Sequence, residues 1–170
     1  MTREMKDKIM DAVRDFRLPR YEEIPNVGLY LEQVTKYMCD CLAPLADVSI
    51  TGSMISNYVK RGLVGNPVKK QYDREQIAYL IYIAVAKNVL SLDDIQTLIE
   101  MQRQTYTPKR AYDYFCSEFE NVLAYVFGLK DTVDTVGSDA SDEKTMLRNT
   151  IITVAHKTYL DMCFRAIQEG

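Results

Sequence analysis

Apolar residues recur every three or four positions along most of the chain, which is the spacing of one face of an α-helix. The helix of residues 74–89 is apolar nearly all round, so we expect it to be buried. Proline, glycine and capping residues separate these stretches and set the predicted helix ends. The predicted helices cover residues 2–16, 27–43, 51–61, 74–89, 91–104, 107–127 and 141–168.

A short β segment is predicted between the third and fourth helices. Gly62 stands where a helix C-terminus favours a left-handed residue, and Gly65-Asn66-Pro67 is a tight-turn cluster. Residues 68–72 then form a short return strand, which places Lys69 and Lys70 near the tip of a small hairpin. A helix, a turn, a short helix, a hairpin and a buried helix, in that order, are the layout of a winged helix-turn-helix.

We therefore predict an all-α fold with a small β-wing. The winged helix-turn-helix spans residues 18–103, after an N-terminal helix within residues 1–17. Residues 104–170 form a C-terminal helical pair that serves as a dimerisation or effector region. The length and apolar stripe of the last helix predict a homodimer through residues 141–168, with or without a contribution from residues 109–127.

Charge is distributed unevenly along the chain, whose net charge is −3. Residues 48–74 carry five basic side chains and one acidic, a net charge of +4, whereas residues 1–47 and 75–170 are both acidic. Such a cationic window is either a solvated face or a docking patch for a polyanion.

The residue types that common catalytic and metal sites need are scarce. His156 is the only histidine, and Cys39 and Cys41 are two positions apart on a predicted helix, so they point to different faces. Asp93 and Asp94 suit the positive end of a helix dipole better than an acid–base pair. No glycine-rich phosphate loop is present. We expect a protein that is not an enzyme, with no metal and no cofactor.

We expect neither a membrane span nor a secretory signal. The longest uninterrupted apolar run, residues 77–86, has ten residues. A membrane span needs about 20. The first eight residues mix charges of both signs, unlike a secretory signal, and four cysteines are too few for a disulfide scaffold. We expect a cytoplasmic protein with reduced thiols and no membrane partner.

The short helix in the cationic window divides into two faces. Its apolar residues face inward, with Tyr58 and Val59 as alternatives at one position, and its small polar residues face outward. Such a polar face suits the major groove of DNA, where Asn57 can form two hydrogen bonds with adenine. The alternative is a protein-interaction module of the same shape that does not bind DNA. The candidate DNA-binding residues are Ser53, Ser56, Asn57, Tyr58, Lys60, Arg61, Lys69, Lys70 and Gln71.

The segment Ser49–Val64 resembles the recognition-helix segment of MerR-type transcriptional regulators. Ile55 matches their apolar anchor, Tyr58 their second aromatic residue, and Gly62-Leu63 the end of the helix before the wing. The resemblance implies a MerR-like winged helix-turn-helix in a dimeric, DNA-binding transcriptional regulator.

A second resemblance is the closer one. Leu18-Pro19 and Ile24-Pro25, followed by the same stretch, are similar to a bacterial family described only as a domain of unknown function. This resemblance spans most of residues 18–103 and implies no activity.

Aromatic residues are concentrated near the C-terminal half. Residues 106–127 hold 7 of the 17 aromatic side chains of the chain. Helical spacing of such residues favours a core or a dimer interface over a pocket for an effector. We leave open a small-molecule effector of unknown identity.

Overall fold

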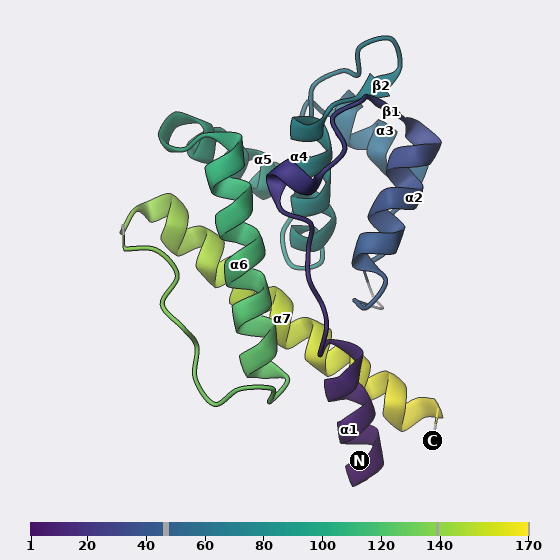
Figure 1. The fold of residues 1–170 in the computed structure, drawn as a ribbon, viewed down its shortest axis with the longest axis vertical. Helices are drawn as coiled ribbons and strands as arrows, with labels where there is room; N and C mark the ends of the chain where they lie inside the picture. Colours follow the sequence, from purple (N-terminus) through teal and green to yellow (C-terminus); the bar gives the residue numbers. More distant parts are fainter. Residues whose placement is uncertain (46–47, 139, 170) are drawn as a thin grey trace.

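The computed structural model describes residues 1–45, 48–138 and 140–169, and this part of the chain is mostly helical (Figure 1). A short 3₁₀ helix, η1 (Tyr21–Glu23), follows the first α-helix, and strands β1 (Leu29–Tyr30) and β2 (Gln71–Tyr72) form an antiparallel pair. This architecture confirms the predicted all-α fold with a small β-wing. The α-helices are α1 (Arg3–Ala12), α2 (Leu31–Leu42), α3 (Gly52–Lys60), α4 (Arg74–Ala86), α5 (Leu92–Thr105), α6 (Pro108–Val126) and α7 (Asp142–Glu169).

Side-chain caps set the starts of three helices. Thr51, Ser91 and Thr107 each accept a hydrogen bond from the backbone N–H three residues further on, at the starts of α3, α5 and α6. These bonds satisfy N–H groups that have no partner within the helix. Gly62, at a φ of +79°, follows the end of α3 in the left-handed region.

The core is built around α4. Ile77, Leu80 and Ile81 are all 0% exposed, and both α6 and α7 contact this helix. Phe119 of α6 is also fully buried and stacks against Phe115 with ring centroids 5.8 Å apart. The prediction of a buried helix at this position is confirmed, because a helix that is apolar on every side needs neighbours on every side.

The β pair forms where a helix was predicted to begin. Residues 27–43 were expected to be helical, but the segment starts in an extended conformation, and Leu29 pairs with Tyr72 while Tyr30 pairs with Gln71. Gly28 has a φ of +76°, which directs the chain out of a helix. A Cβ atom at Gly28 would lie 2.9 Å from Oε1 of Gln71, so the Gln71 side chain would have to shift to admit another residue there.

The extended segment between α1 and η1 is fixed against α6. Arg20 forms two hydrogen bonds with the Glu120 carboxylate, both 2.7 Å long, and Glu120 also accepts a 2.8 Å bond from the backbone of Leu18. The Tyr112 hydroxyl donates to the carbonyl of Pro19 at 2.9 Å. These contacts join the segment before η1 to the C-terminal helices, whereas the division of the chain at residue 104 stays a prediction.

Both termini lie near the end of the molecule opposite the β pair (Figure 1). α1 packs on α7 there and buries Ile9 and Val13. α1 ends at Ala12 rather than at the predicted residue 16, since Val13 leaves the helical conformation with φ −113° and ψ 3°. In the described residues, no helix combines the length and the hydropathy that a membrane crossing requires.

Candidate nucleic-acid interface

The α3 helix presents a polar face to solvent and an apolar face to the core. Ser53, Ser56, Asn57 and Lys60 are exposed and follow the spacing of one helix face, whereas Ile55 is 0% exposed. The predicted outward positions of this helix are therefore on the surface. Their assignment to DNA stays a prediction.

Tyr58 does not belong to this surface. Its side chain is only 3% exposed, whereas Val59 is half-buried, so Tyr58 occupies the inward position that the sequence left open between the two. Burial raises the pKa of its phenol. The inclusion of Tyr58 among the DNA-contacting residues was wrong, because the i+3 spacing from Ile55 places its ring in the core.

A shallow hollow adjoins the polar face of α3. Ser53 and Asn57 line it from α3, and Lys87 and Ser91 line it from the connection between α4 and α5. The Lys87 ammonium donates a 2.6 Å hydrogen bond to the carbonyl of Ser49, and partial burial lowers its pKa. Sequence reasoning missed Lys87, because it follows a buried helix and carries no local signal that it would lie beside α3.

The tip of the hairpin is formed by two lysines. Val68 and Gln71 pair across the turn through hydrogen bonds of 2.9 and 3.1 Å, and Lys69 and Lys70 lie between them with φ of 50° and 64°. Two-residue turns with both central residues at positive φ favour Asn-Gly, because other residues are strained there. The lysines lie at the tip as predicted. The predicted return strand of residues 68–72 was too long, because the turn falls at Lys69 and Lys70 rather than at Gly65-Asn66-Pro67, and only Gln71–Tyr72 is a strand, paired with β1. The wing, meaning residues 65–72, therefore holds two cationic side chains in an unfavourable backbone conformation.

The cationic residues of the window differ in their partners. Arg61 forms an ion pair with the exposed carboxylate of Asp93 on α5. Lys60, Lys69 and Lys70 are exposed and form no ion pair with any described residue.

Arg74 and Gln71, at the base of the wing, contact other parts of the protein rather than solvent alone. The Arg74 guanidinium donates to the carbonyl of Ile24 at 2.9 Å and pairs with Glu22. Gln71 is half-buried in the strand pair beside Gly28. The positive charge that faces solvent is therefore smaller than the sequence suggests, and three lysines provide it.

Other chemistry-bearing residues lie apart from one another. His156 is exposed on α7, Cys39 is exposed on α2, and Cys116 and Cys163 are buried free thiols. Across residues 1–45, 48–138 and 140–169, no three His, Cys, Asp or Glu side chains gather in a group that could hold a metal ion.

Sequence comparison assigns the chain to a family. A family profile described as "Domain of unknown function (DUF1836)" matches residues 19–115, more than half of the chain. The chain belongs to the DUF1836 family. The DUF1836 match runs from the segment before η1 through α2, α3, the wing, α4 and α5 into α6, so it contains the whole candidate interface. No curated protein and no solved structure gives a significant match.

Proposed function

We propose that this protein is a DNA-binding transcriptional regulator, in which α3 contacts base edges and the wing contacts phosphates. The observation that carries the proposal is the pair of lysines at the wing tip, whose φ angles of 50° and 64° are both left-handed. Strained backbone conformations cluster at functional sites, and this turn carries two positive charges that form no ion pair with any described residue. Phosphate contacts of this kind supply most of the affinity of proteins for DNA.

The polar face of α3 supplies the groups that recognise bases. Asn57 can accept and donate in the major groove, and Ser53 and Ser56 can do either with most bases. Lys60 follows on the same face, where it suits a phosphate contact. The resemblance of Ser49–Val64 to the recognition-helix segment of MerR-type regulators supports the same assignment.

A homodimer through α7 is part of the proposal. Leu160, Phe164 and Ile167 are 51%, 57% and 53% exposed, and their spacing places them on one face of α7. Exposed apolar residues that are aligned in this way are typical of a protein–protein interface. A second copy of the chain would cover the same stripe.

The salt dependence of DNA affinity tests the proposal. Fluorescence anisotropy with a labelled random duplex, repeated at several salt concentrations, gives the number of phosphates contacted. Lys60, Lys69 and Lys70 in each protomer predict a slope of log K against log salt of about −2.7 per protomer. Absence of binding at low salt would refute the proposal and favour a protein-interaction module. In such a module, the Arg61–Asp93 ion pair would neutralise part of the cationic surface.

A further inference from the structure

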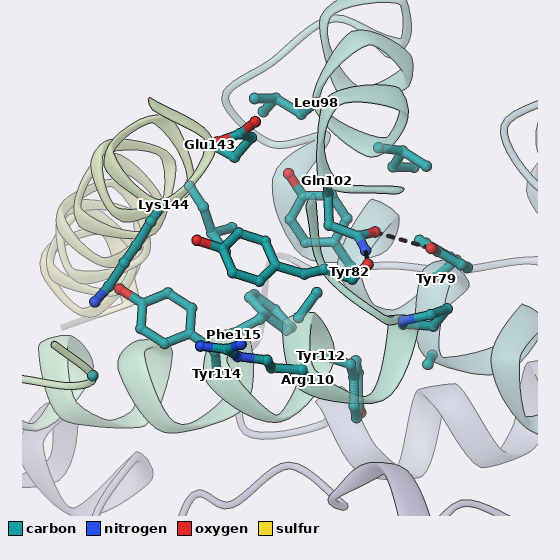
Figure 2. Close-up of a pocket in the computed structure, with 17 residues that line it drawn as sticks. Tyr79, Tyr82, Leu98, Gln102, Arg110, Tyr112, Tyr114, Phe115, Glu143 and Lys144 are labelled. Atoms are coloured by element: carbon teal, nitrogen blue, oxygen red, sulfur yellow. Dashed lines mark hydrogen bonds between the residues drawn. The ribbon is translucent and has the colours of Figure 1, made fainter. Parts of the chain in front are cut away.

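A pocket lies between α4, α5, α6 and the start of α7 (Figure 2). Its volume is about 180 Å³. An apolar cavity of about 150 Å³ stays dry and binds benzene, so this pocket has room for a single ring with a small substituent. Tyr79 and Tyr82 line it from α4, and Tyr114 and Phe115 line it from α6. The aromatic residues concentrated in residues 106–127 therefore serve both the core and a pocket.

Aliphatic side chains form much of the remaining wall. Ala78 lines the pocket from α4, Leu98 and Ile99 line it from α5, Ala111 from α6 and Leu147 from α7. Ala78, Leu98 and Ile99 are buried. Such side chains offer dispersion contacts and no hydrogen bonds, so this part of the wall favours an apolar ligand over water.

Polar groups of the wall bond to other groups of the protein. The Tyr79 hydroxyl donates a 2.9 Å hydrogen bond to the Gln102 side chain, and Gln102 donates in turn to the backbone carbonyl of Tyr106 at 2.7 Å (Figure 2). The Tyr106 hydroxyl lies 2.9 Å from that of Ser141, and the two form a hydrogen bond. These bonds fix the side chains around the pocket, so an apolar ligand would enter without breaking them.

The charged side chains of the wall also have partners. Arg110, Glu143 and Lys144 are the charged residues among the described lining residues. The Arg110 guanidinium lies 5.2 Å from the ring centroid of Tyr106, and the Lys144 ammonium lies 5.2 Å from that of Tyr114. Glu143 accepts a 2.9 Å hydrogen bond from the last residue of α5, and its pKa is lowered by hydrogen bonds. Neither a carboxylate nor an ammonium group would find a vacant partner among these residues, and burying an unpaired charge is costly.

We infer that this pocket binds an uncharged aromatic compound with a single ring. The Tyr82 and Phe115 rings already pack edge-on with centroids 5.3 Å apart, so this part of the wall presents the aromatic edges and faces that favour a third ring. The aliphatic residues of α5 and α7 supply the remaining apolar contacts. Binding of this ligand goes beyond the proposed function and does not depend on whether the protein binds DNA.

Toluene titrated into the full-length protein tests the inference. For a ligand of this size we expect a Kd of about 0.1–1 mM, followed by amide NMR shifts at Ala111 and Leu147. Benzoate and benzylammonium carry a negative and a positive charge on a similar ring. Each should bind at least about tenfold more weakly than toluene, because either charge would lose its hydration without gaining a partner.

Three variants locate the binding. Ala111→Leu should fill the pocket from α6 and reduce toluene affinity at least about tenfold. Ala124→Leu makes the same change at a half-buried position of α6 that is not among the lining residues, and this variant should bind toluene like the natural chain. Leu147→Ala should enlarge the pocket, so the affinity for the two-ring probe 2-naphthol should rise about tenfold relative to that for toluene.

Filling and enlarging the pocket thus have opposite expected effects, and the enlarged variant keeps the test decisive if Ala111→Leu does not fold. The inference is overturned if toluene does not bind, or if benzoate or benzylammonium binds as well as toluene. It is also overturned if Leu147→Ala leaves the ratio of the 2-naphthol and toluene affinities unchanged, or if a folded Ala111→Leu protein binds toluene like the natural chain.

Discussion

Replacing the wing-tip lysines should make the protein more stable and its DNA binding weaker. In the double variant Lys69→Asn, Lys70→Gly, residues that tolerate positive φ occupy the positions now at 50° and 64°. A left-handed residue other than glycine destabilises the fold by about 1–2 kcal/mol. Lys70→Gly removes this cost, but the greater chain entropy of glycine in the unfolded state lowers the stability by about 0.5–1 kcal/mol. Because asparagine contributes a further few tenths, the net gain should be about 0.5–1.5 kcal/mol.

Urea denaturation measures the stability and anisotropy measures the DNA affinity. A gain of 1 kcal/mol should raise the Tm by about 2–4 °C for a chain of this length. Loss of two phosphate contacts should change the salt slope from about −2.7 to about −0.9 per protomer. The matched control is Lys69→Gln, Lys70→Gln, which removes the same two charges and keeps two side chains in the left-handed region.

The two variants separate strain from charge. We expect them to lose the same DNA affinity, and we expect only the Asn-Gly variant to be stabilised. Equal stability of the two variants would show that the turn stores no strain and would remove the observation on which the proposed function rests. An unchanged salt slope in both would show that the wing does not contact phosphates.

Three further predictions address the base contacts, the dimer and the core. Asn57→Ala should cost about 1–3 kcal/mol on a preferred DNA site and relax preference at one base pair, whereas random duplex should bind unchanged. Phe164→Glu should give a monomer by light scattering, because it places a charge in the exposed apolar stripe of α7. Arg148→Met leaves the Glu118 carboxylate, 1% exposed, without the partner 3.0 Å away. Urea unfolding should show a loss of about 2–3 kcal/mol, and Glu118→Gln in that background should recover most of it.

Local signals in the sequence were enough to place the helices. Caps such as Thr51 and Ser91 act on N–H groups three residues away, so their effect on a helix start can be predicted without knowing the fold. The polar face of α3 could also be predicted, because the spacing of its apolar residues fixes which side is buried. The choice between Tyr58 and Val59 could not, since both lie near the edge of that face.

Contacts between distant segments could not be predicted from these signals. β1 has two residues, and its partner strand lies 42 positions later in the chain, so the local pattern favoured a longer helix. The Arg61–Asp93 ion pair joins α3 to α5 and removes one charge from the predicted cationic patch. The ring contact between Tyr82 and Phe115 likewise depends on the packing of α4 on α6, which the aromatic pattern of each helix alone does not predict.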